Sequence, residues 1–172
     1  VGYYAGLSIT DGHTNTFVGS EAGDSITTGD ENVAIGHGAL DAGTTVNGNT
    51  AIGTDAMGGS LTGSYNTAVG YNAMLTAAGV SGTTAIGNQA LDALTTGDNN
   101  TGVGSGALGA NTTGASNTAV GYTALDANTT AANNTGVGYN SLGANTTGEG
   151  NTGVGKDALA VNTTAGNNTA VG

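Results

Sequence analysis

Apolar residues recur along this chain at a fixed spacing of 17 residues. A Val or Ile followed by Gly marks every step, from Val1-Gly2 to Val171-Gly172, and no insertion interrupts the series, so ten periods fill the 172 residues. The idealised unit reads N-T-A-V-G-Y-x-A-L-x-A-N-T-T-G-x-N, with positions numbered 1 to 17 from its first Asn. A fixed period indicates a repeat architecture in which each unit stacks on the next.

The unit favours short strands and tight turns over helices. Its glycines and β-branched residues disfavour a helix, and helical repeats need about 33 residues or more. Two short strands with Gly- and Asn-rich turns fit 17 residues, and stacked coils of this kind lie about 4.8 Å apart. We therefore predict an all-β fold: a parallel β-solenoid, or β-roll, of ten 17-residue coils that forms a single repeat region over residues 1–172.

Position 4 is always Val or Ile and is expected to lie inside the coil. Strand alternation places positions 2 and 4 on one face, and we take that face as the interior. Gly at position 5 permits a turn or a close backbone approach that a Cβ would block. The predicted core column is Val18, Ile35, Ile52, Val69, Ile86, Val103, Val120, Val137 and Val154.

Ala at position 8 and Leu or Met at position 9 are adjacent, so in a regular strand they point to opposite faces. If Ala points inward, position 9 forms an outward apolar stripe, which is typical of an interface. We favour lateral association of chains, most simply a homotrimer; the alternative is a turn that rotates these side chains inward and leaves a monomeric rod. The predicted interface column is Leu40, Met57, Met74, Leu91, Leu108, Leu125, Leu142 and Leu159.

The first two units differ from the others in their apolar columns. They carry Gly6 and Gly23 at position 9, and Ile9 and Ile26 at position 12. This exchange indicates that apolar volume has moved from one column to another within a packed core.

Charge excludes several classes of partner. Twelve acidic residues face one basic residue, Lys156, and the formal net charge is −11. Nucleic acid and anionic lipid both require basic residues, so neither is an expected partner. The chain has no Cys, which excludes disulfides and thiolate metal sites. No segment approaches the roughly 18 apolar residues of a membrane span, so no membrane insertion is expected.

Catalytic chemistry is poorly represented. His13 and His37 fall in expected surface turns without an evident partner, and catalysis requires a positioned one, so we predict no enzyme activity and no cofactor. Asp24 and Asp41 fall in adjacent coils at position 10, which places like charges about 5 Å apart. A structural calcium ion between them is the alternative to a simple solvated face.

Asn and Thr columns give three further predictions. Asn at position 1 is expected to form an amide ladder along the rod. N-x-T sequons mark Asn111, Asn128, Asn145 and Asn162 as candidate glycan acceptors, although the repeat itself generates such sequons. Thr pairs at positions 13 and 14, such as Thr95-Thr96, raise the possibility of ice binding, but only one residue of each pair is expected to face outward.

The segment Asn117-Thr118-Ala119-Val120-Gly121, continued by Tyr122-Thr123-Ala124-Leu125-Asp126-Ala127-Asn128-Thr129-Thr130, resembles repeats of phage tail-fibre and bacterial surface-fibre proteins. The V-G and I-G steps are also similar to the head repeats of trimeric autotransporter adhesins. The resemblance implies a left-handed roll, and a structural fibre that supports adhesion or host attachment at a cell surface, in the extracellular space or on a virion. We expect a segment of a longer or polymeric fibre that self-associates as a homotrimer or an end-to-end filament, with a cell-surface glycan as a further partner.

The alternative function is a solenoid module that binds glycan or ice. Such a module needs a regular array of exposed residues. Position 6, which we expect to be exposed, is instead variable: it reads Tyr3, Ser20, His37, Thr54, Tyr71, Asn88, Ser105, Tyr122, Tyr139 and Lys156. We therefore prefer the structural fibre.

Overall fold

Ten three-residue strands occupy positions 2 to 4 of successive units in the computed structural model, which describes residues 1–59 and 61–172. The described residues contain no helix, so the predicted all-β parallel solenoid is confirmed. The strands are β1 (Thr16–Val18), β2 (Val33–Ile35), β3 (Thr50–Ile52), β4 (Thr67–Val69), β5 (Thr84–Ile86), β6 (Thr101–Val103), β7 (Thr118–Val120), β8 (Thr135–Val137), β9 (Thr152–Val154) and β10 (Thr169–Val171).

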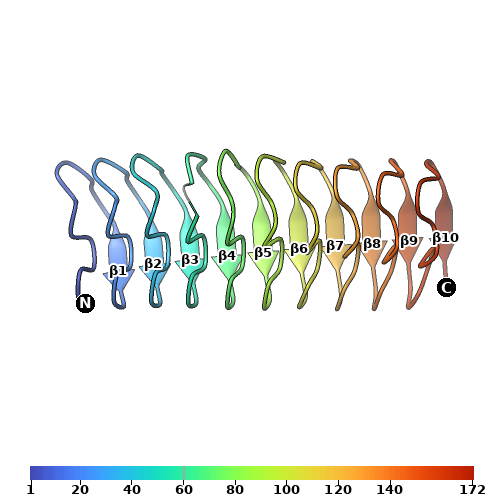
Figure 1. Cartoon of the computed structure of the whole chain (residues 1–172), viewed down its shortest axis with the longest axis horizontal. Helices are drawn as coiled ribbons and strands as arrows, with labels where there is room; N and C mark the ends of the chain where they lie inside the picture. The colour runs from blue at the N-terminus through green and yellow to red at the C-terminus, as the bar shows by residue number, and fades with distance from the viewer. Residues whose placement is uncertain (60) are drawn as a thin grey trace.

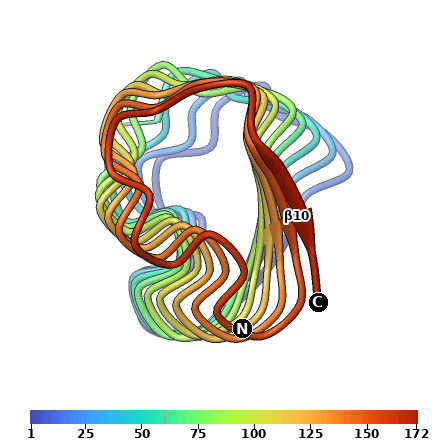
Figure 2. The ribbon, with the colours of Figure 1, turned by 90° about the vertical axis from the view of Figure 1, so that its right-hand side faces the viewer.

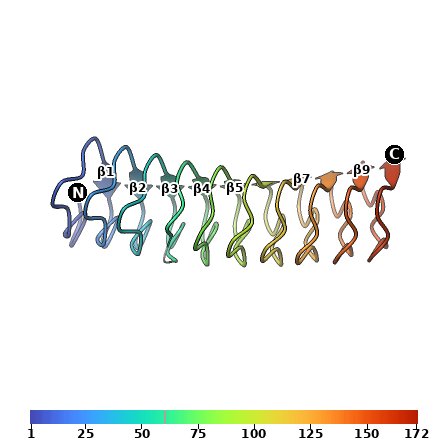
Figure 3. The ribbon, with the colours of Figure 1, turned by 90° about the horizontal axis from the view of Figure 1, so that it is seen from above.

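Each strand pairs in parallel with the next one along the chain, and β1 to β10 form one sheet in sequence order. The register is 17 residues throughout; Thr50 pairs with Thr67, for example, and Thr67 with Thr84. The coils therefore stack into a rod with the termini at opposite ends (Figure 1), and the sheet runs along its whole length (Figure 3). Seen from the C-terminal end, the chain turns clockwise as it advances toward the viewer, so the solenoid is left-handed (Figure 2).

Glycine at position 5 allows the coils to approach closely, as predicted. In Gly104 the φ angle is +138°, within the left-handed half of the map that side chains rarely adopt. A Cβ added there would collide with the carbonyl oxygen of Gly121 in the next coil. The same relation holds between Gly121 and Gly138. This column requires glycine because backbone, rather than a side chain, fills the space beyond each Cα.

The Leu and Met column at position 9 lies inside the rod, which corrects the predicted interface. Leu40, Met57, Met74, Leu91, Leu108, Leu125 and Leu142 are fully buried, and Leu159 in the last coil packs against the same core. The reason is a turn: all eight residues have φ between +52° and +55°. A left-handed residue breaks strand alternation, so Ala at position 8 and Leu or Met at position 9 both face inward. The alternative in which a turn rotates the column inward is the correct one.

The Val and Ile column at position 4 lies on the outside, which corrects the predicted core. Val18, Ile35, Ile86, Val120 and Val154 expose 36–42% of their area, and Ile52, Val69, Val103 and Val137 are half-buried. Alternation does place positions 2 and 4 together, but the inward residue of each strand is the one between them, at position 3.

Position 3 holds small residues because its side chain points inward, where the Leu column leaves little space. A Cβ added to Gly136 would lie 3.3 Å from Cγ of Leu125, tighter than most van der Waals contacts. The exception to the small residues is Phe17 in β1, and there the space comes from position 9. A Cβ on Gly6 or Gly23 would lie 2.7 or 2.6 Å from the Phe17 ring. The ring therefore replaces the missing Leu side chains, together with the buried Ile26.

The Asn ladder at position 1 is present as predicted. Asn66, for example, donates from both its backbone N–H and its Nδ2 to Oδ1 of Asn49, at 2.9 and 3.2 Å, and also from Nδ2 to the carbonyl of Val80 at 2.7 Å. These amides are buried, so each one joins two coils in a site where an unpaired polar group would be costly. Thr83, the one Thr in this column, continues it by accepting the backbone N–H of Asn100 at 3.2 Å.

Candidate functional site

Positions 2 and 4 together make one outward surface of the sheet, which we call the sheet face. Its first column holds Thr at position 2 in nine strands and Val33 in β2. Its second column is the Val and Ile series at position 4. Because the strands are paired in register, each column runs the length of the rod without a gap (Figure 1). The sheet face is the most regular exposed surface of the described chain.

The sheet face is uncharged, and its hydroxyl groups are not engaged by the protein. None of the twelve acidic residues, nor Lys156, occupies position 2 or 4. Among the described residues, no position-2 hydroxyl donates to a protein acceptor, whereas Thr hydroxyls at position 13 do; Thr112 Oγ1, for example, donates to the carbonyl of Thr129 at 3.0 Å. The position-2 hydroxyls are therefore available to water, beside a column of methyl groups.

Aromatic residues border the sheet face in the C-terminal coils. The rings of Tyr122 and Tyr139, at position 6, stack with centroids 5.7 Å apart and an interplanar angle of 18°. Nζ of Lys156 lies 5.6 Å from the centroid of Tyr139 and 3.7 Å from a carboxylate oxygen of Asp157. Because the rings stack along the rod axis, they present mainly edges to the solvent. Position 6 is exposed as predicted, but it is not part of the regular array.

Three of the four candidate glycan acceptors are buried. Asn111, Asn128 and Asn145 are completely buried and form a second amide ladder at position 12. Nδ2 of Asn128, the atom that would carry a glycan, donates to Asn111 Oδ1 at 3.1 Å and to the carbonyl of Ala131 at 3.0 Å. Asn162 is half-buried and its Nδ2 is engaged in the same way. For Asn111, Asn128 and Asn145 the prediction is wrong, because Asn at position 12 turns into the coil; for Asn162 it stays a prediction.

Asp41 and Asp126, at position 10, have raised pKa values, mainly because of burial. Burial raises the pKa of Asp41, and the carboxylates of Asp24, Asp55 and Glu21 raise it further. Its Oδ1 is buried and has no hydrogen-bond partner among the described residues. Burial also raises the pKa of Asp126. In the part of the chain that the structure describes, no group of three or more His, Cys, Asp and Glu residues is arranged to hold a metal ion.

Both histidines lie beside carboxylates on neighbouring coils. Nδ1 of His13 is 3.6 Å from Asp30, and the ring of His37 lies between Glu21 and Asp55, at 3.7 Å from each. All of these side chains are substantially exposed. They belong to surface columns, and the structure reveals no pocket in the described residues.

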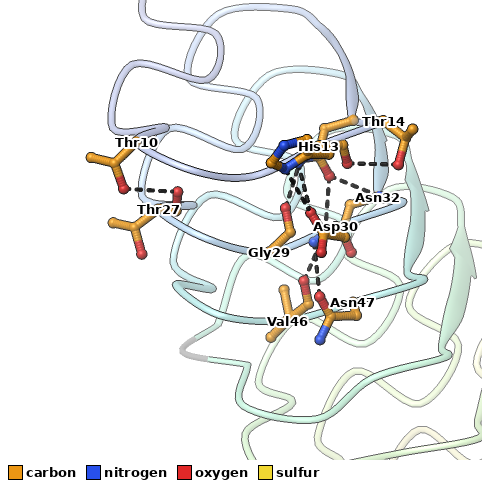
Figure 4. A network of polar contacts seen from close by, with 10 residues as sticks. Thr10, His13, Thr14, Thr27, Gly29, Asp30, Asn32, Val46 and Asn47 are labelled. Atoms are coloured by element: carbon orange, nitrogen blue, oxygen red, sulfur yellow. Dashed lines mark hydrogen bonds and ion pairs between the residues drawn. The ribbon is translucent and has the colours of Figure 1, made fainter.

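The contact between His13 and Asp30 is part of a polar ladder at position 16 (Figure 4). The backbone N–H of His13 donates to Asp30 Oδ1 at 2.6 Å, and the N–H of Asp30 donates to Asn47 Oδ1 at 2.8 Å. Ser64 and Ser81 continue the series. These side chains therefore cap backbone donors of adjacent coils, which is a structural role.

Comparison of the chain with protein-family models, with curated proteins and with solved structures found no match. The described residues contain no helix that is long and apolar enough to span a membrane.

Proposed function

We propose that this chain is a structural component of an extracellular or virion fibre, where it acts as a stiff spacer for an adhesive or attachment element. The observation that carries the proposal is the unbroken coil-to-coil bonding. Besides the parallel sheet, the Leu column bonds across coils, as in Leu108 N–H to the carbonyl of Ala124 at 3.0 Å, and so do the Asn ladders. Stability in such a rod is approximately a sum over neighbouring coils, so length is added without a new core.

Growth along the axis fits this architecture better than the three-fold bundle. The homotrimer was expected from an outward Leu and Met column, and that column is buried. At the C-terminal end of the sheet, β10 pairs with β9 alone, and an unpaired strand edge accepts a further strand. At the other end the first coil already covers β1, as in the bond from Gly19 N–H to the carbonyl of Val1 at 2.9 Å. The proposal is therefore an end-to-end filament of stacked coils. The rod surface carries net negative charge, which keeps parallel rods apart.

Electron microscopy of tandem chains tests the spacer. Two copies are joined in phase, with Val171-Gly172 of one serving as Val1-Gly2 of the next. At about 4.8 Å per coil, the rod should lengthen from about 48 Å to about 96 Å with no change in width. A matched control carries eight extra residues at the junction, which breaks the phase and should give a bent or jointed particle. An in-phase fusion that forms two separate compact bodies would contradict the proposal.

Localisation tests the biological part of the proposal. Antibodies raised against the folded rod should label filaments at the surface of the producing cell or on virions in immunogold microscopy. Labelling confined to the cell interior would overturn the fibre role while leaving the rod architecture intact.

A further inference from the structure

The sheet face is a two-dimensional array of alternating hydroxyl and methyl groups. Neighbouring strands lie about 4.8 Å apart, and residues at positions 2 and 4 of one strand lie about 6.8 Å apart. Both columns run through all ten strands. Thr is replaced once, by Val33, and position 4 holds only Val or Ile. Position 6, which is exposed in most coils, varies freely, so this regularity is a property of the sheet face rather than of the whole surface.

The array is held rigidly. Behind it lie the Leu and Met column and the small residues of position 3, all buried in the described coils between Ala34 and Leu142. At its edge the Gly column fixes the spacing, because each Gly backbone contacts the next coil. Each coil is rotated by a small step relative to the one before it, and these steps add up to a twist along the rod (Figure 2). A surface fixed in this way keeps neighbouring side chains at a constant spacing, which a mobile loop does not.

The size and chemistry of the sheet face disfavour a second copy of the chain as its occupant. Nine strand spacings of about 4.8 Å and a width of about 10 Å give roughly 430 Å², whereas stable interfaces bury about 800 Å² on each partner. Half of the face consists of Thr hydroxyls that have no protein partner among the described residues. A charged or polymeric ligand is also disfavoured, because the face has no charge and no pocket.

We propose that the sheet face binds ice. Its hydroxyl groups hydrogen-bond to water at regular intervals, and the adjoining methyl groups of Val, Ile and Thr restrain that water without competing for its hydrogen bonds. Its two spacings are close to repeat distances of the oxygen lattice of hexagonal ice. Water on the face is thereby ordered in a pattern that a growing ice surface can incorporate. The ligand is crystalline water, and the interaction requires an uninterrupted array of hydroxyl and methyl groups.

A second Thr column provides an internal control. Thr96, Thr113 and Thr130, at position 14, are exposed and repeat at the same axial spacing. They lie between the buried position-15 residues and the half-buried Thr column at position 13, whose hydroxyls donate to backbone carbonyls of the next coil, and they have no Val or Ile column beside them. If hydroxyl spacing along the rod were sufficient, this column would bind ice as well.

The test measures the fraction of fluorescently labelled protein that enters a slowly growing ice hemisphere, together with inhibition of ice recrystallisation. The wild-type chain should enter the ice. Thr118→Lys, at the centre of the sheet face, should lose most of the ice-bound fraction, and Thr113→Lys, which makes the same charge change at position 14, should retain it. Circular dichroism and thermal melting confirm that both variants fold.

Three results would overturn the proposal. The wild-type chain is excluded from ice like an ordinary protein; both Lys variants lose binding equally; or sedimentation shows a stable oligomer that Val120→Lys dissociates, which means that a second copy occupies the face. None of these results depends on the fibre role, because the tandem rod lengthens whether or not its sheet face binds ice.

Discussion

The N-terminal and C-terminal halves of the rod close the same coil around different interiors. In the N-terminal half, taken here as the coils up to residue 98, positions 12, 13 and 15 supply fully buried apolar side chains: Ile26, Val46, Leu61, Val80 and Leu94. In the C-terminal half, position 12 is Asn, and Asn111, Asn128 and Asn145 form a buried hydrogen-bonded ladder. Backbone pairing is parallel and in register across both halves.

The polar ladders change at the same place. At position 16, side chains from Asp30 to Asp98 accept backbone N–H groups of neighbouring coils in the N-terminal half. Ala115 and Ala132 follow at this position and cannot do so. Coil closure therefore depends on the columns common to both halves, namely positions 1, 5, 8 and 9. Position 12 accepts either an apolar side chain or a complete amide network.

The largest loss of stability should come from placing Asn in the interior of the N-terminal half. Ile26→Asn loses the burial of its side chain and leaves an amide without a ladder partner, a cost of about 4 kcal/mol. Leu94→Asn lies one coil from Asn111 and extends the existing ladder, so its cost should be about half as large. Chemical denaturation followed by circular dichroism measures both. Equal losses would mean that the two interiors are not distinct.

A smaller effect is expected from the reverse exchange. Asn128→Leu removes a donor to the carbonyl of Ala131 and an acceptor for Nδ2 of Asn145, which should cost about 2 kcal/mol. Changing Asn111, Asn128 and Asn145 to Leu together removes these amides along with the neighbouring amides that they bond to, so few side-chain groups are left without a partner. The triple variant should therefore lose much less than three times the single loss. Strictly additive losses would show that the Asn residues do not act as a network.

The smallest effect concerns the acidic column. The raised pKa of Asp41 arises first from burial and then from nearby carboxylates. The folded state therefore binds a proton more readily than the unfolded state, so stability rises as pH falls from neutral toward the ordinary Asp value and is lower above the raised pKa. Asp41→Asn should stabilise the rod at pH 7 by about 0.5 kcal/mol or less, given partial solvent screening.

Asp126→Asn provides the matched comparison. Its raised pKa has burial alone as its cause, so the gain at pH 7 should be smaller and less sensitive to salt than that of Asp41→Asn. Melting temperatures between pH 3 and pH 8, at low and high salt, test this. A loss of stability in Asp41→Asn at neutral pH would show that the carboxylate is held by favourable contacts.

The architecture followed from the sequence because the 17-residue period and the Gly column are strong constraints. The identity of the inward face did not, since alternation groups Thr118 with Val120 but does not say on which side they lie. Two features of the sequence indicate that position 3 is the inward one. Position 3 admits only Ala or Gly except at Phe17, and Phe17 coincides with Gly6 and Gly23. A residue whose size covaries with that of another column is an interior residue.

The left-handed conformation at position 9 was not predictable from local preference. Leu125 and its equivalents are ordinary side chains at φ near +53°, where Gly and Asn are usual. Burial of the whole column in a closed coil outweighs that local strain. The burial of the Asn residues at position 12 was not predictable for a related reason, because a sequon pattern and a buried ladder use the same residues.

The central claim is that Leu and Met at position 9 fill the rod and that Val and Ile at position 4 cover its surface. The most direct test compares the stability of two variants, Leu125→Asp and Val120→Asp, which change one residue of each column in the same coil. The first buries an unpaired charge and should cost several kcal/mol, whereas the second places a charge at an exposed strand position and should cost about 1 kcal/mol or less. A Val120→Asp variant that unfolds as readily as Leu125→Asp would contradict the account.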